Sequence, residues 1–147
     1  MQSCYVDTSA LLKRFLQELG AAEFDTFIAD FEGELVLSPL GLTEFASALQ
    51  RRVRMREVTT DYAQAAYSRL MGEISVGAWT IEPFAATIFL QATQTIQAGD
   101  MSLATLDALH LMTAVQLAKR TGSWQIATSD KQLGAAAKQL NFTVHYF

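Results

Sequence analysis

The stretch SCYVDTSALLKRFL, residues 3–16, decides the fold class of this 147-residue chain. Ser3 to Val6 is a short apolar run of the kind that forms buried strands, and Asp7-Thr8-Ser9 follows it as a polar turn. Apolar residues then recur at helical spacing until Gly20, at Leu11, Leu12, Phe15, Leu16 and Leu19. A strand that ends in a polar turn and continues as a helix predicts one unit of an α/β protein.

The same alternation continues to the end of the chain. Further strands are predicted at residues 34–37, 79–81, 124–128 and 142–146. Further helices are predicted at 21–31, from 42 into the arginine run, 59–74, 83–97, 103–119 capped by Ser102, and 131–140, with Asn141 in the left-handed conformation after the last. No tight hairpin signal separates the strands. The pattern therefore predicts a three-layer α/β/α sandwich with a mostly parallel, about five-stranded central sheet, in one domain spanning 1–147.

The composition restricts the class of protein and its compartment. Half of the residues are hydrophobic and only 18% are charged, which argues against disorder. The single cysteine, Cys4, cannot form an internal disulfide, and no apolar run is long enough for a membrane span, so a cytoplasmic protein is expected. The net charge of −4 counts against a protein that coats nucleic acid, although Arg51, Arg52, Arg54 and Arg56 form a basic run.

Acidic residues follow the predicted strands. Asp7 and Asp130 each stand between a strand and a helix, so both should face the crevice beyond the carboxyl ends of a parallel sheet. Glu44 is expected in the first turn of the helix after the second strand. Asp107 lies within an otherwise apolar helix, where an unpaired carboxylate would be costly to bury. Strand order alone does not predict that this helix brings Asp107 to the same crevice.

Four segments carry a resemblance to a known family. They are, in order, Asp7-Thr8-Ser9-Ala10-Leu11-Leu12, Leu42-Thr43-Glu44-Phe45-Ala46-Ser47-Ala48-Leu49, Asp107-Ala108-Leu109-His110-Leu111 and Thr128-Ser129-Asp130-Lys131-Gln132-Leu133. Together they resemble the acidic motifs of PIN-domain ribonucleases, and among these the VapC-like toxins of toxin–antitoxin pairs. The resemblance covers essentially the whole chain, and four motifs in order are more specific than any one of them.

The resemblance implies a metal-dependent endoribonuclease. Asp7, Glu44, Asp107 and Asp130 would be the catalytic, metal-binding acids, and oxygen ligands of this kind select Mg²⁺ or Mn²⁺, as one or two ions. Thr8, Ser9, Arg51 and Arg52 are candidate substrate-binding residues, because hydroxyls and guanidinium groups bind phosphate oxygens. The implied partners are RNA, a cognate antitoxin and a second copy of the chain in a homodimer.

Other interpretations remain for each feature. Asp7 and Asp130 also fit ordinary helix N-caps, the arginine run also fits a solvated helix end, and His110 fits a packed, hydrogen-bonded support better than a proton shuttle. A non-catalytic PIN-like module that binds RNA or protein is one alternative function. A magnesium-dependent phosphatase or phosphotransfer domain is another, although Ser9 stands where such a phosphatase would carry its second Asp.

Overall fold

The computed structural model describes all residues from Met1 to Phe147 and contains one five-stranded sheet. Its strands are β1 (Ser3–Val6), β2 (Glu34–Leu37), β3 (Thr80–Ile81), β4 (Gln125–Thr128) and β5 (Thr143–Tyr146). All neighbouring strands are parallel, in the order β3-β2-β1-β4-β5. The predicted α/β fold class is confirmed, and the sheet is entirely parallel.

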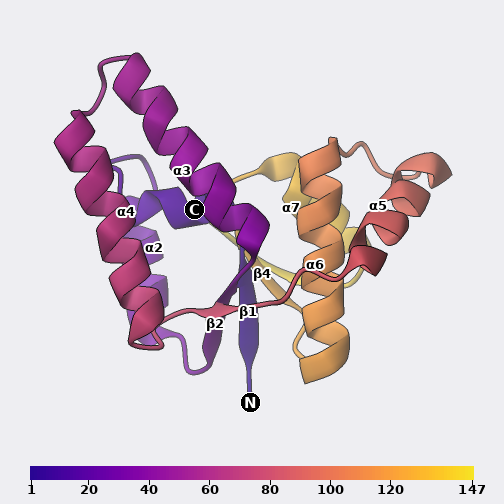
Figure 1. Cartoon of the computed structure of the whole chain (residues 1–147). Helices are drawn as coiled ribbons and strands as arrows, with labels where there is room; N and C mark the ends of the chain where they lie inside the picture. Colours follow the sequence, from indigo (N-terminus) through magenta and orange to yellow (C-terminus); the bar gives the residue numbers. More distant parts are fainter.

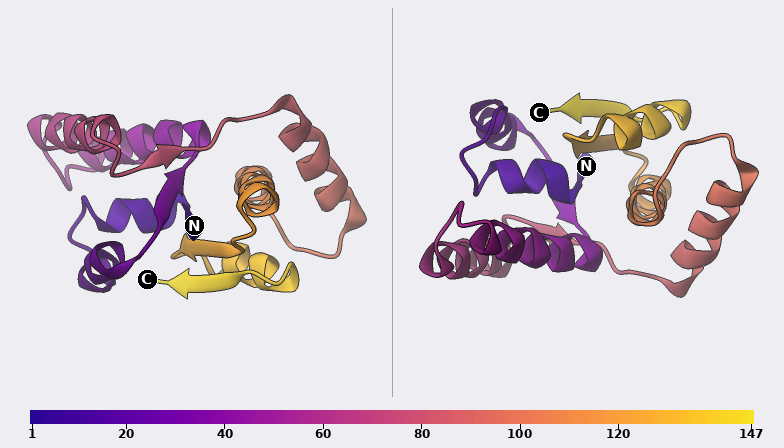
Figure 2. Two further views of the ribbon diagram at one scale, coloured as in Figure 1. Left: turned by 90° about the horizontal axis from the view of Figure 1, so that it is seen from below. Right: turned by 90° about the horizontal axis from the view of Figure 1, so that it is seen from above.

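Seven helices connect the strands and cover both faces of the sheet (Figures 1 and 2). They are α1 (Thr8–Lys13), α2 (Ala21–Asp30), α3 (Pro39–Arg54), α4 (Thr60–Ser75), α5 (Ala86–Ala98), α6 (Thr105–Thr121) and α7 (Lys131–Gln139). Helices α1 to α4 lie on one side, with α3 and α4 forming a long pair. Helices α6 and α7 pack on the other side, and α5 packs against α6.

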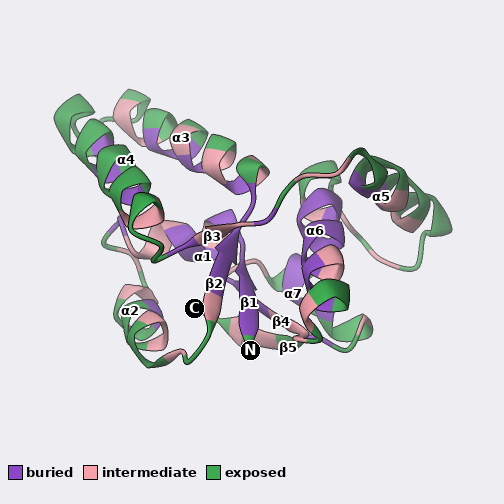
Figure 3. Ribbon diagram, turned by 60° about the horizontal axis from the view of Figure 1, so that its bottom comes forward, coloured by how far each residue is buried: buried purple, intermediate pink, exposed green.

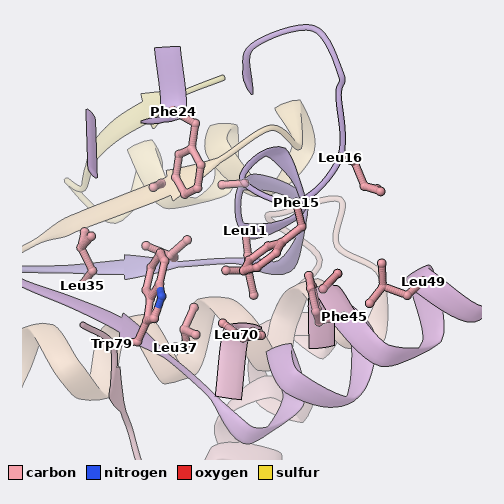
Figure 4. Close-up of a cluster of buried hydrophobic side chains, with 14 of the residues drawn as sticks. Leu11, Phe15, Leu16, Phe24, Leu35, Leu37, Phe45, Leu49, Leu70 and Trp79 are labelled. Carbon is pink, nitrogen blue, oxygen red and sulfur yellow. The ribbon is translucent and has the colours of Figure 1, made fainter. Parts of the chain in front are cut away.

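The central strand β1 divides its side chains between two hydrophobic cores because successive residues of a strand point to opposite faces. Cys4 and Val6 join the core under α1 to α4, whereas Tyr5 joins the core under α6 and α7. Figure 4 shows the first core, where Phe15 and Phe45 meet edge to face at 5.0 Å between ring centroids. Figure 3 shows that β1, β2 and much of α6 are buried. Burial on both faces explains why the inner strands β1 and β2 read as nearly continuous apolar runs.

Several predicted helix boundaries are wrong. Helix α1 ends at Lys13, and although Phe15 and Leu16 still reach the core from the following turn, Leu19 is 94% exposed. Helix α3 begins at Pro39, capped by Ser38, so Glu44 lies in the second turn and not the first. Helix α5 begins at Ala86, beyond Pro83.

Two further cap predictions have different outcomes. Helix α6 begins at Thr105 after Ala104, which offers no side-chain cap, so Ser102 does not cap it. Asn141 does adopt a left-handed conformation, with φ of 65°, between α7 and β5.

The strand order creates a crevice beside β1. From β1 the chain moves outward to β2 and β3, and later returns to place β4 and β5 on the other side of β1. Parallel sheets bind ligands at such a point of reversal, beyond the carboxyl ends of the strands. None of the helices has the length and apolar character needed to cross a membrane.

Candidate active site

A pocket of about 380 Å³ opens beyond the carboxyl ends of β1 and β4. Helices α1, α3 and α6 and the start of α7 contribute its walls. All four predicted acids line it, namely Asp7, Glu44, Asp107 and Asp130. The fold thus brings together carboxylates that are 123 positions apart in sequence, from residue 7 to residue 130, at the sheet edge where the strand order reverses.

Asp7 is the most deeply buried of these acids. It follows β1 and caps α1, and its carboxylate accepts hydrogen bonds from the backbone N–H of Ala10 at 3.0 Å, from Oγ of Ser9 at 2.9 Å and from Oγ1 of Thr128 at 3.0 Å. Burial raises the pKa of Asp7 to about 6, against the opposing effects of the nearby His110 and of these hydrogen bonds. Asp7 is therefore rigidly held and is easier to protonate than an ordinary aspartate.

Asp130 is tied to Asp7 through Thr128. Thr128 donates to Asp7 and accepts a hydrogen bond from the backbone N–H of Asp130 at 2.9 Å. Asp130 caps α7 through Oδ1 alone, which accepts from the backbone N–H groups of Gln132 and Leu133 at 2.7 and 3.0 Å. Asp130 is thus an N-cap as well as a pocket residue, and its second oxygen makes no hydrogen bond to the protein.

Glu44 is oriented by a chain of buried polar groups. Thr8 donates to its Oε1 at 2.8 Å, and Nε2 of His110 contacts the same oxygen. Nδ1 of His110 lies 2.6 Å from the hydroxyl of Tyr5, which donates to Oγ of Ser38 at 2.9 Å. Burial alone would raise the pKa of Glu44, but the contacts with His110 and Thr8 outweigh burial and hold the pKa below its ordinary value.

The surroundings of His110 fit a packed, hydrogen-bonded residue that supports the site better than a proton shuttle. His110 is only 2% exposed, and both ring nitrogens have partners, Tyr5 and Glu44. The three-residue spacing of Asp107 and His110 on α6 indicated that His110 lies on the same helical face as Asp107. Nothing in the sequence indicated the contact with Tyr5, which reads as an ordinary strand residue.

Asp107 differs from the other three acids because its carboxylate forms no hydrogen bond with the protein. It lies in the first turn of α6, which packs against β1 and β4 and so directs its N-terminal end to the pocket. Burial raises the pKa of Asp107, and the negative charges of Asp130 and Glu44 raise it further, against the effect of His110. A cation bound between these carboxylates would relieve that repulsion.

The predicted substrate-binding residues divide into two groups. Thr8, Ser9 and Arg51 line the pocket. Arg52 does not, because it forms ion pairs with Glu18 and Glu57 on another side of α3. Arg54 belongs to the same basic run but was not among the predicted substrate-binding residues, and it does line the pocket. The signal was the recurrence of Ser47, Arg51 and Arg54 at positions i, i+4 and i+7, which places them on one helical stripe.

The donors in the pocket fit a hard divalent cation in their chemistry. Carboxylate and hydroxyl oxygens are the ligands of Mg²⁺ and Mn²⁺, and the one nearby imidazole is occupied by Tyr5 and Glu44. No three Asp, Glu, His or Cys side chains in the chain are gathered closely enough to form a ready-made metal cluster. The carboxylates of Asp107 and Asp130 have oxygens available to an ion, whereas Asp7 and Glu44 carry several hydrogen bonds.

Comparison with known proteins agrees with this geometry. The model of the PIN domain family matches residues 4–139. The chain belongs to the PIN domain family. Proteins of this family are typically nucleases and commonly depend on metal. Comparison with curated protein sequences gives no match.

Several solved structures share the fold of this chain at low sequence identity. VapC20 of Mycobacterium tuberculosis, described as a toxin that cleaves the sarcin–ricin loop, has a TM-score of 0.69 and 19% identity over 90% of this chain and 94% of its own. FitAcB of Neisseria gonorrhoeae has a TM-score of 0.69 and 17% identity, covering 97% and 96%. VapBC2 of Rickettsia felis, solved with a DNA fragment, has a TM-score of 0.65 and 10% identity, covering 99% of both chains.

Proposed function

We propose that this PIN domain is a metal-dependent endoribonuclease that hydrolyses phosphodiester bonds of RNA with Mg²⁺ or Mn²⁺. The observation that carries the proposal is the convergence of Asp7, Glu44, Asp107 and Asp130 on one pocket, where the charges of Asp130 and Glu44 act on the carboxylate of Asp107. Structural roles explain Asp7 and Asp130 as caps and Asp107 as a first-turn acid of α6, but they do not require all four acids to face one pocket.

Some residues of the pocket would bind the divalent ion, and others would hold the carboxylates in position. A bound divalent ion would supply a water of lowered pKa and would neutralise charge that develops on the phosphate. Asp7 and Glu44 keep fixed orientations because Ser9, Thr128, Thr8 and His110 hold them. Thr8 donates its hydroxyl proton to Glu44 and Ser9 donates its proton to Asp7, so both hydroxyls help to hold the carboxylates in place. The attacking group would be water, with no covalent enzyme intermediate.

We further propose that the protein is a cytoplasmic toxin that forms a homodimer and is restrained by an antitoxin. Relatives of the same fold have been crystallised with antitoxin partners. Large apolar side chains remain exposed on the helices, including Tyr67 and Met71 on α4 and Phe89 and Leu90 on α5, which is common on surfaces that meet other proteins.

The decisive experiment is cleavage of labelled RNA with Mg²⁺, with Mn²⁺ and with chelator. We expect cleavage only with metal, and a loss of roughly 100-fold or more in Asp107→Asn, because this change removes a charge used in the transition state. Asp100→Asn, at an exposed acid outside the pocket, is the matched control and should cut at the wild-type rate. Cleavage in chelator, or full activity of Asp107→Asn, would contradict the proposal.

The same variants separate toxicity from other effects of expression in bacterial cells. Wild type and Asp100→Asn should arrest growth, and Asp107→Asn should not. RNA binding without cleavage under all metal conditions would instead identify the non-catalytic, RNA-binding alternative.

A further inference from the structure

We propose that Arg51 and Arg54 bind RNA phosphates next to the one that is cut, so that the RNA strand runs from the acidic pocket along the C-terminal half of α3. This inference rests on the proposed ribonuclease function and adds to it the path of the substrate. It distinguishes two arginines of the run at 51–56 from the other two.

The four arginines have different surroundings. Arg51 and Arg54 are exposed, line the acidic pocket and form no ion pair. Arg52 is held by Glu18 and Glu57, and Arg56 follows the end of α3 in a left-handed backbone conformation and does not line the pocket. Unpaired guanidinium groups are therefore available in the pocket at only two positions of the run.

Their lack of ion pairs is informative because carboxylates lie in the same pocket. Glu44, the acid on the same helix, is already engaged by Thr8 and His110. Two cations that face a pocket of acids without pairing with them leave their donors free for an external anion. Arginine presents a planar fork of donors that matches phosphate oxygens, and a phosphodiester strand is the anion that the proposed reaction requires.

Helix geometry sets the distance between these arginines and the acids. At 1.5 Å per residue, Arg51 and Arg54 lie about 10 and 15 Å beyond Glu44 along the axis of α3. A stacked strand carries one phosphate about every 3.4 Å, so the guanidinium groups reach phosphates beyond the one at the acids. Helix α3 extends away from the sheet toward its C-terminal end, which gives the strand one direction of travel (Figure 1).

The test compares Arg51→Gln, Arg54→Gln and the double variant with Arg52→Gln and Arg56→Gln, which remove the same charge elsewhere in the run. The substrate is an oligoribonucleotide that the wild type cuts at one position. We expect KM to rise about tenfold for each pocket arginine, with kcat within about twofold, because these contacts hold substrate away from the reacting atoms. The slope of the logarithm of the binding constant against the logarithm of salt concentration reports the number of phosphate contacts. That number should fall by about one for each arginine removed. Both control variants should stay within about twofold of wild type.

A second arm locates the contacted phosphates. Uncharged methylphosphonate linkages are placed one at a time on either side of the cut, and binding is measured by fluorescence anisotropy in chelator. In the wild type, affinity should fall for linkages on one side only, and in the double variant these linkages should have no further effect. Equal sensitivity of wild type and double variant to every linkage would overturn the inference, as would equal losses in the control variants.

The two arms also separate this inference from the proposed function. If the wild type cuts no RNA, the binding arm with an unstructured oligoribonucleotide still decides whether Arg51 and Arg54 contact phosphate. If the wild type cuts RNA and the pocket arginines affect neither KM nor binding, the inference fails while the nuclease function stands. If the arginine variants bound an antitoxin more weakly but bound RNA as the wild type does, Arg51 and Arg54 would belong to a protein contact, and the inference would be overturned. Equal melting temperatures of all variants exclude misfolding.

Discussion

Asp7 and Asp107 show how two identical side chains acquire different properties in one pocket. Asp7 is buried with three hydrogen-bond donors, whereas Asp107 is half-buried with none and faces the charges of Asp130 and Glu44. Both pKa values are raised, first by burial. In the protein without metal, the ionised form of each is therefore disfavoured, and a cation would favour it.

The raised pKa of Asp7 predicts a pH-dependent stability. Because the folded state binds this proton more tightly than the unfolded state, the stability that protonated Asp7 contributes is complete below about pH 4 and is lost as the pH rises through about 6. The change from 3.8 to about 6 corresponds to about 3 kcal/mol. We therefore compare the unfolding free energies of Asp7→Asn and wild type in chelator. The difference in favour of the variant should be larger at pH 8 than at pH 4 by up to about 3 kcal/mol, since Asn does not titrate and keeps the capping ability.

Urea denaturation at the two pH values measures this difference. Asp100→Asn should show nearly the same difference from wild type at both. If the advantage of Asp7→Asn were equal at pH 4 and pH 8, Asp7 would not titrate as the structure indicates.

Helix α3 is the element that joins the two parts of the site. Its N-cap, Ser38, accepts hydrogen bonds from the backbone N–H of Gly41 at 3.1 Å and from the hydroxyl of Tyr5. The same helix carries Glu44 in its second turn and Arg51 and Arg54 near its end. A change at the cap can therefore alter the orientation of Glu44 through two routes, the start of the helix and the contact from Tyr5 to His110.

Two N-cap variants separate stability from activity. Ser38→Ala and Thr59→Ala each remove a capping hydrogen bond and should cost about 1–2 kcal/mol of unfolding free energy. Thr59 caps α4 at the surface, so its variant should cut RNA at the wild-type rate. Ser38→Ala should also lower kcat by about tenfold, because a small misplacement of Glu44 is sufficient. Equal activity of both variants would show that the chain from Ser38 to Glu44 does not support the site.

The elements also show which features the sequence can reveal. The strands β1 and β2 were predicted well because each is a short run of mostly apolar, buried residues that ends at polar or turn residues. Helix ends were predicted less well, since Phe15 and Leu16 keep the helical spacing and still reach the core from a hydrogen-bonded turn that follows the end of α1. The backbone N–H of Glu82 donates to the carbonyl of Leu37, so the chain is still extended beside β2 just before Pro83. Helix α5 therefore begins only at Ala86.

At the scale of the whole molecule, the site depends on contacts that no local pattern contains. The four acids could be nominated from the sequence, but their meeting required the strand order and the docking of α6 on β1 and β4. The contact between Tyr5 and His110 joins residues 105 positions apart, and the hydrogen bond from Thr128 to Asp7 joins residues 121 positions apart. Such pairings are set by the fold and not by spacing.

Metal binding should stabilise the whole molecule. A ligand at about 100 times its dissociation constant adds about 2.7 kcal/mol to the unfolding free energy, which for a chain of this size raises the melting temperature by roughly 5–10 °C. We expect this rise with Mg²⁺ or Mn²⁺ in the wild type and little of it in Asp107→Asn. Calorimetry with NaCl at matched ionic strength is the control. A similar rise with NaCl, or in the variant, would show that the effect is ionic strength rather than occupation of the pocket.

The central position of β1 has a consequence for how the protein is made. Asp7 is translated early, but the pocket also needs Asp130, which is translated only near the end of the chain. A nascent chain, or one truncated before β4, lacks one wall of the pocket. If the proposed nuclease function holds, such a chain should be unable to cut the messenger from which it is translated, and the proposed antitoxin would have until the end of translation to be present.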